Sequence, residues 1–136
     1  MSDATRSITL DWTGGLTFRG GPPGAPPVDL DGDVIQAPGP MHGLLVALAG
    51  CVGADVVSIL PKMQVDLGTC RIVASGERSP EPPRRYVSLH LHIHLAGTGL
   101  DEAKARRAIT LSLETYCSVR HSLDPSIPLT WDLTLE

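Results

Sequence analysis

Aromatic residues are scarce in this sequence, and charges of one sign never accumulate. The 136 residues include two Trp, two Tyr and one Phe, and the formal net charge at pH 7 is −4. So few rings do not provide a platform on which nucleic-acid bases stack. A chain with a small negative charge also lacks the basic surface that attracts nucleic acid or an anionic membrane. We therefore expect no nucleic-acid partner and no membrane partner.

Cysteine is also scarce, and long apolar runs are missing. The chain has three cysteines, which are Cys51, Cys70 and Cys117. This odd, low number is a poor disulfide framework for a secreted protein. The first ten residues, MSDATRSITL, lack the apolar segment of a signal peptide. The longest apolar run covers 43–54, ends at Asp55, and predicts no bilayer span. We expect a soluble cytoplasmic protein with reduced thiols.

The patterns along the chain predict one domain over residues 1–136 with an α+β fold. Alternating residues predict strands near 8–12, 16–18, 34–35, 69–76, 87–95 and 129–135, the last at a sheet edge. Helical spacing predicts helices over 40–61 and 101–117. Proline and glycine predict loops over 20–33 and 79–85. This order of elements is typical of a mainly antiparallel sheet with helices on one side.

The first predicted helix has almost no polar surface, so we expect a central helix that is buried on most sides. Leu48, Cys51 and Asp55 share one of its faces, and Gly50 belongs to a stripe of small residues. Small neighbours leave room for a substrate at the Cys51 sulfur. A packing cysteine is the alternative, because free cysteine is among the most buried residue types. Asp55 should suppress the Cys51 thiolate, so an active Cys51 would need a compensating cation.

The other two cysteines differ in their sequence neighbourhoods. Cys117 precedes Arg120 and His121, and such a basic neighbourhood favours the thiolate. It could equally be a half-buried cysteine that only packs. Since 66 residues separate Cys51 from Cys117, the two can pair only if the fold brings them together. We expect Cys70, in a strand segment, to be structural.

Histidines at alternate positions of one strand are a possible metal motif. His90, His92 and His94 share a strand face, and pairs of this kind can bind zinc. Three of them span about 13 Å, which is too long for one ion to take all three. We therefore expect a polar strand face without metal, and a capping or surface role for His42. The glycine-rich segment lacks the ending of a phosphate-binding loop, so no cofactor is expected either.

Two segments resemble the OsmC/Ohr family. PMHGLLVALAGCVGADVVSIL, residues 40–60, resembles the central helix of the branch with an L-A-G-C-x-G-x-D-V-V-S-I-L pattern. ETYCSVRHSL, residues 114–123, is similar to the Y-C-S-V segment of that branch. The resemblance covers the chain from Thr9 to its C-terminus. It implies an OsmC-like fold in an intertwined homodimer with active sites at the subunit interface.

The resemblance also implies an activity and its residues. Members reduce organic hydroperoxides through two cysteines, an antioxidant role in stress response. Carried over, Cys51 would be the peroxidatic cysteine and Cys117 the resolving cysteine, and a small thiol or dithiol would reduce the enzyme again. Family peroxidases activate the cysteine with a Glu in the first helical turn and an Arg from an N-terminal loop. Here that turn reads Met41-His42-Gly43, and Arg19 is the arginine near such a loop.

The departure in the first helical turn leaves a second function open. Without the activating Glu, the same interface cleft could hold a small apolar or thiol ligand with no turnover. The cysteine pair favours the enzyme, and the missing Glu favours the binding protein. A metal protein built on the histidine strand is the weakest of the three alternatives.

Overall fold

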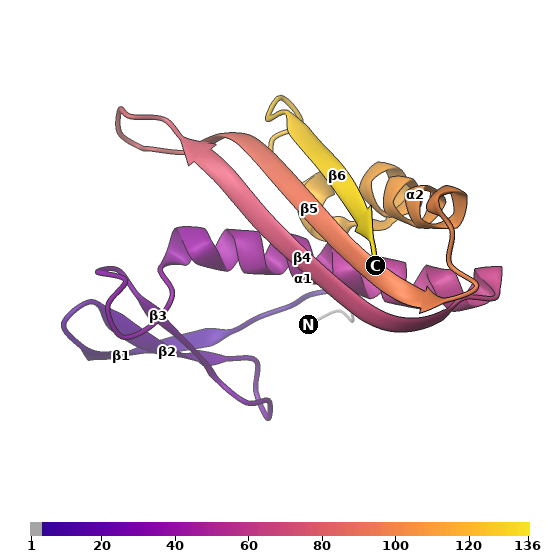
Figure 1. Cartoon of the computed structure of the whole chain (residues 1–136). Coiled ribbons are helices and arrows are strands. Elements are labelled where there is room, and N and C mark those ends of the chain that lie inside the picture. The colour runs from indigo at the N-terminus through magenta and orange to yellow at the C-terminus, as the bar shows by residue number, and fades with distance from the viewer. Residues whose placement is uncertain (1–3) are drawn as a thin grey trace. The chain divides into compact units, whose positions relative to one another are not determined.

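A computed structural model describes residues 4–136 of the chain (Figure 1). The strands are β1 (Thr9–Gly14), β2 (Thr17–Gly21), β3 (Val28–Asp31), β4 (Asp66–Arg78), β5 (Tyr86–Thr98) and β6 (Leu129–Leu135). The helices and turns are α1 (Pro40–Ile59), the 3₁₀ turn η1 (Leu60–Met63), α2 (Glu102–Leu111), the π turn η2 (Ser112–Tyr116) and α3 (Ser118–Ser122). The chain divides into two compact units, Met1–Leu44 and Leu45–Glu136.

The N-terminal unit contains an antiparallel sheet in the order β1-β2-β3. The predicted loop over 20–33 is wrong in part, because β2 reaches Gly21 and β3 begins at Val28. All four prolines of that segment lie between these strands, in 22–27. Their missing N–H groups therefore take nothing from the ladder. The true loop is only the proline-rich part.

The predicted strand at Val34 and Ile35 is wrong, because a side chain holds this segment in a turn. The buried carboxylate of Asp31 accepts the backbone N–H groups of Asp33, Ile35 and Gln36 at 2.8, 3.1 and 2.9 Å. Val34 takes a left-handed φ of 55°. The same hydrogen bonds hold the pKa of Asp31 below its usual value. An Asp that binds the following N–H groups competes with strand formation.

The C-terminal unit contains the sheet β4-β5-β6, with β5 in the centre. β5 runs antiparallel to β4 and parallel to β6. The parallel pair requires a long crossover, which α2, η2 and α3 supply. The predicted α+β class is confirmed, with mainly antiparallel pairing in two sheets and β6 at an edge.

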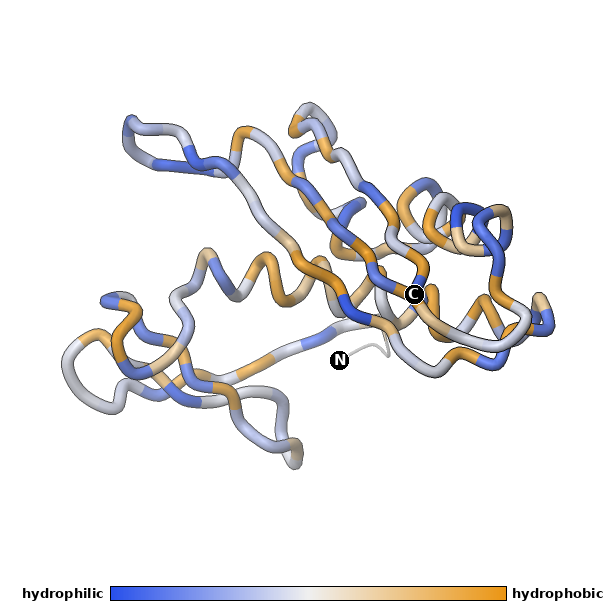
Figure 2. The backbone as a smooth tube through the Cα atoms, in the orientation of Figure 1, coloured by the Kyte–Doolittle hydropathy of each residue, from blue (hydrophilic) through white to orange (hydrophobic). Residues whose placement is uncertain are grey.

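The core of this unit lies between the sheet and the helices. The apolar face of β5 is buried through Leu89, Leu91, Ile93 and Leu95. Figure 2 shows the apolar and polar alternation along β5, and Figure 1 shows α1 crossing behind β4 and β5. A Cβ added at Gly53 of α1 would lie 3.4 Å from Ile72 Cδ1 of β4. The small residue therefore lets helix and sheet approach closely.

The central helix is less buried than its composition suggests. Leu48, Val52 and Val56 are buried, but Val46 and Val57 remain 65% and 48% exposed. The span Pro40–Met63 is long and apolar enough to cross a membrane by length and composition, with 22% of its most apolar window buried. The apolar pattern thus continues past Asp55, where the 43–54 run ended. Within residues 4–136, the exposed valines leave part of an apolar helix face uncovered.

The second helix starts as predicted and ends differently. The Asp101 carboxylate caps α2 by accepting the Lys104 N–H at 2.8 Å. The α-helical pattern stops at Leu111, the π turn follows from Ser112, and Cys117 comes directly after that turn.

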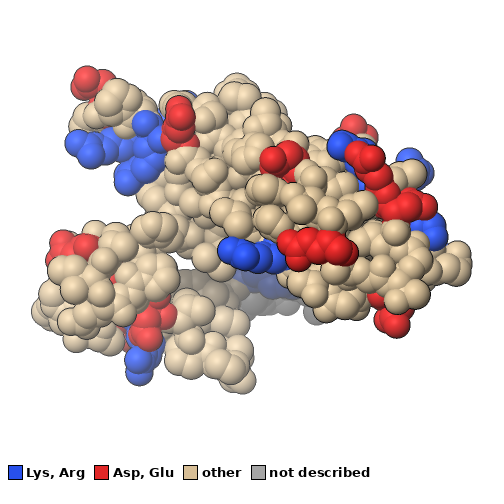
Figure 3. Space-filling view, in the orientation of Figure 1, with Lys and Arg blue, Asp and Glu red and all other residues tan. Residues whose placement is uncertain are grey.

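Charged side chains of both signs are mixed over the face of the protein shown in Figure 3.

Candidate functional site

Cys51 and Cys117 lie together, although 66 residues separate them. Cys51 comes from the middle of α1, and Cys117 follows the π turn η2. Cys51 lies close enough to Cys117 to help raise the pKa of its thiol, and both are free thiols. Cys51 is partly exposed, whereas Cys117 is completely buried. The partly exposed cysteine of the two is therefore the one on the central helix.

The π turn determines where Cys117 lies. The backbone N–H of Cys117 donates to the Ser112 carbonyl oxygen at 2.7 Å, five residues back. π turns of this kind are rare and occur frequently at functional sites. The Cys117 sulfur in turn accepts the Arg120 N–H at 3.3 Å and so caps α3. Cys117 is thus fixed from both sides along the chain.

The surroundings of Cys117 keep it protonated. Burial, and to a lesser extent the neighbouring Cys51, raise the pKa of Cys117 to about 11, although the Arg120 N–H opposes the shift. The guanidinium of Arg120 donates to the carbonyl oxygens of Asp124 and Ile127 at 3.4 and 2.9 Å. The expected thiolate-favouring neighbourhood is therefore wrong, because desolvation outweighs the nearby basic residue.

Asp55 is not the bare carboxylate that the sequence suggested. It is partly buried, and its Oδ2 accepts the hydroxyl of Ser112 at 2.7 Å. Ser112 is completely buried, so this hydrogen bond satisfies its hydroxyl group. Sequence reasoning missed Ser112, because no motif or spacing connects it with Asp55.

Arg19 lies in the N-terminal unit, on β2. Its Nε and Nη2 donate to the two carboxylate oxygens of Asp29 on β3 at 2.7 and 3.1 Å. This fork-shaped contact lowers the pKa of Asp29. Both groups line a cavity of about 370 Å³ together with Thr13, Thr17, Gln36 and Ala37. The first turn of α1 carries no acidic side chain.

Cys70 lies on β4 opposite Leu95. It is partly buried, and burial raises the pKa of its thiol. The raised pKa leaves less of this thiol as the reactive thiolate at neutral pH.

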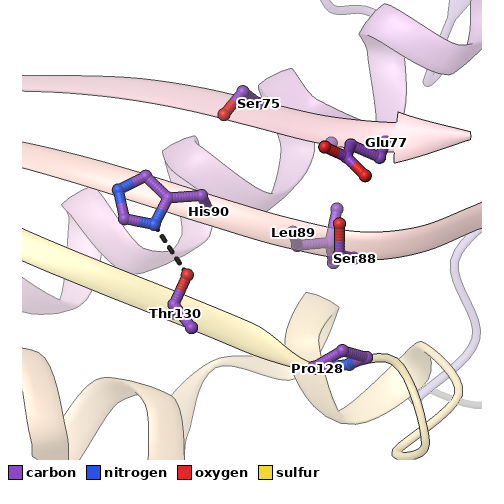
Figure 4. A pocket seen from close by; sticks show the side chains of 8 residues that line it. Ser75, Glu77, Ser88, Leu89, His90, Pro128 and Thr130 are labelled. Carbon is purple, nitrogen blue, oxygen red and sulfur yellow. Dashed lines mark hydrogen bonds between the residues drawn. The ribbon is translucent and has the colours of Figure 1, made fainter.

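The three histidines contact the neighbouring edge strand. Imidazole nitrogens of His90, His92 and His94 lie 3.0, 2.8 and 3.2 Å from Asp132 Oδ1, Thr134 Oγ1 and Glu136 Oε1. Figure 4 shows His90, also bonded to Thr130, at a cleft of about 490 Å³. Within residues 4–136, no three His, Cys, Asp or Glu side chains are arranged to hold a metal ion. At the start of α1, His42 Nδ1 accepts the Gly39 N–H at 3.2 Å, a local capping contact.

Comparison with known proteins shows which proteins this chain resembles in sequence and in structure. A family model described as OsmC-like protein matches residues 31–132. Protein YhfA of Escherichia coli K12 is 38% identical over 122 residues, which are 89% of this chain and 91% of YhfA. A hypothetical protein from Aquifex aeolicus has 26% identity and a TM-score of 0.86, over 97% of this chain and 98% of that one.

A more distant structure carries a functional name. The organic hydroperoxide resistance protein OhrB of Bacillus subtilis has 13% identity and a TM-score of 0.64, over 96% of this chain and 98% of that one. At this identity the likeness shows the fold alone.

Proposed function

The chain belongs to the OsmC-like protein family, and from this membership we propose that it is a thiol-dependent peroxidase that reduces organic hydroperoxides. Cys51 is the peroxidatic cysteine in this proposal, and Cys117 is the resolving cysteine. The name of OhrB connects this fold with organic hydroperoxide resistance and hence with stress defence.

The proximity of Cys51 to Cys117, which helps to raise the pKa of Cys117, is the observation that carries the proposal. Two neighbouring thiols can form a disulfide when the geometry of their Cα and Cβ atoms allows it. The partly exposed Cys51 is open to an oxidant, whereas the buried Cys117 is not.

The reaction balances with two thiols and one hydroperoxide. The Cys51 thiolate attacks the terminal oxygen of ROOH, the O–O bond breaks, and the alkoxide leaves and is protonated to ROH. Cys51 is now a sulfenic acid. The Cys117 sulfur attacks Cys51, a disulfide forms, and hydroxide leaves and takes up the Cys117 proton as water. A small dithiol then reduces the disulfide by two electrons and two protons.

The raised pKa of Cys117 fits the resolving role. A thiol that stays protonated at neutral pH does not compete with Cys51 for the hydroperoxide. It can also donate its S–H to the Cys51 thiolate before the attack. Once Cys51 is oxidised, the same proximity makes Cys117 the nearest nucleophile.

Arg19 is proposed as the cation that assists Cys51, although its guanidinium is engaged by Asp29. This assignment rests on the family resemblance, and it requires the Arg19 guanidinium to leave Asp29 during the reaction.

We further propose one domain over residues 1–136, because the family match begins at residue 31 and crosses the boundary between the two units after Leu44.

A homodimer is proposed as the active assembly. Exposed apolar side chains on α1, including Val46 and Val57, provide a face that a second copy could cover. We further propose that α1 is an internal helix of that assembly and that the protein is cytoplasmic.

Turnover of cumene hydroperoxide with dithiothreitol tests the function. We expect the wild-type protein to consume the hydroperoxide and Cys51→Ser to lose all turnover. Cys117→Ser should form a Cys51 sulfenic acid that dimedone traps, with turnover reduced when the reductant is limiting. Cys70→Ser is the matched control and should keep wild-type turnover. A wild-type protein without turnover would exclude the peroxidase.

A non-catalytic binding protein is the second candidate function. The first turn of α1 without a carboxylate is the observation that favours it. It predicts saturable binding of a small apolar or thiol ligand that is unchanged in Cys117→Ser. Binding without hydroperoxide consumption would select this function over the peroxidase.

A further inference from the structure

Asp55 and Ser112 connect the two segments of the chain that carry Cys51 and Cys117. Cys51 and Asp55 lie four residues apart on α1, one turn from each other on the same face. Asp55 accepts the Ser112 hydroxyl at 2.7 Å. The Ser112 carbonyl accepts the Cys117 N–H at 2.7 Å. Cys117 in turn lies close enough to Cys51 for Cys51 to help raise its pKa.

The π turn makes this arrangement possible. In a regular α-helix, residues five apart point about 140° away from each other around the axis. The π hydrogen bond from Cys117 to Ser112 widens the turn by one residue. Ser112 and Cys117 can then both face α1, where Asp55 and Cys51 also lie one turn apart.

The Asp55–Ser112 hydrogen bond is the side-chain link between α1 and the beginning of this turn. Ser112 is completely buried, and without Asp55 its hydroxyl would lose the partner that the structure gives it. Hydrogen bonds to charged groups are stronger than those between neutral groups. Loss of this link would free the start of the turn, and with it the position of Cys117.

We propose that Asp55 and Ser112 are positioning residues that hold the π turn against α1 and thereby keep the Cys117 sulfur within reach of Cys51. That this positioning matters for turnover rests on the proposed function. The effect on disulfide formation can be measured without any hydroperoxide. Both residues act, in this proposal, through the separation of the two sulfurs.

Equilibrium with glutathione measures this positioning directly. Cys51 and Cys117 together reduce one glutathione disulfide to two glutathione molecules and form one protein disulfide. The full-length chain is used in a Cys70→Ser background, so that one intramolecular disulfide can form, and alkylation with mass spectrometry gives its fraction. We expect Asp55→Ala and Ser112→Ala each to lower the equilibrium constant for the disulfide roughly tenfold, the worth of one such hydrogen bond.

Two further variants separate positioning from general destabilisation. Asp55→Asn keeps an oxygen that accepts the Ser112 hydroxyl, and it should stay within about threefold of the parent equilibrium constant. Ser58→Ala, at an exposed serine of α1, should leave the constant unchanged. A purely structural role would lower the melting temperature of Asp55→Ala and Ser112→Ala without moving this equilibrium.

The outcomes distinguish this inference from the function. Parent-like disulfide formation in both alanine variants would overturn the positioning role and leave the peroxidase proposal intact. A tenfold loss in a protein that does not consume cumene hydroperoxide would support positioning and reject the peroxidase. A parent protein that forms no Cys51–Cys117 disulfide in the glutathione buffer would overturn both.

Discussion

At the scale of single residues, burial separates the roles of the two adjacent cysteines. Cys51 is partly exposed and can meet a substrate, while Cys117 is buried with a pKa of about 11. The nearby Arg120 does not reverse this, because its guanidinium is directed at backbone carbonyls. Desolvation therefore assigns the protonated, resolving role to Cys117 in the proposed reaction.

The raised pKa of Cys117 predicts a pH dependence of stability. Folding raises this pKa from 9.0 to about 11, so the folded state holds the proton more tightly than the unfolded state. The stabilisation is complete below pH 9 and is lost as the pH rises through 11. Under reducing conditions, the free energy of unfolding of the wild type should fall relative to that of Cys117→Ser between these pH values. A constant difference across the range would contradict the shift.

The sequence could indicate some of the site residues and not others. Cys51 and Cys117 follow from motifs, because each stands in a distinctive segment. The hydrogen bond from Ser112 to Asp55 could not be predicted, because it depends on a π turn that no sequence pattern announces. The protonation of Cys117 could not be decided from the sequence, since neighbours along the chain do not report burial.

At the scale of elements, hydrophobic alternation was the most informative signal. β5 buries alternate residues between Leu89 and Leu95, as its pattern predicts. The segment at Val34 and Ile35 was misread because Asp31 captures its backbone N–H groups. The first helix was placed correctly, and within residues 4–136 its buried side chains are Leu48, Val52 and Val56.

Ile93 tests the role of β5 in the core. It is completely buried, so Ile93→Ala should lower the free energy of unfolding by about 2–5 kcal/mol. His92, the residue before Ile93, points to the polar face, and its Nε2 lies 2.8 Å from Thr134 Oγ1. His92→Ala should cost no more than about 1.5 kcal/mol. Urea denaturation measures both, and equal losses would contradict the assigned faces.

At the scale of the whole molecule, the exposed part of α1 predicts assembly. We expect light scattering to give twice the 14.4 kDa mass of one chain. Val46, 65% exposed on α1, would be buried by a second copy, and Val46→Asp should weaken association at least about tenfold because a charge would be desolvated. Val73, 45% exposed on β4, provides a matched control, since Val73→Asp should leave the mass unchanged. A monomeric wild type would contradict the dimer.

The cysteine pair is the central claim, and mass mapping after one equivalent of cumene hydroperoxide tests it most directly. The reduced protein is treated without added reductant, the remaining thiols are alkylated, and the peptides are identified. The account predicts one disulfide between Cys51 and Cys117, with Cys70 alkylated. A disulfide that includes Cys70 would contradict it. So would a Cys51 that is still a free thiol after the treatment and is alkylated to the same extent as in untreated protein.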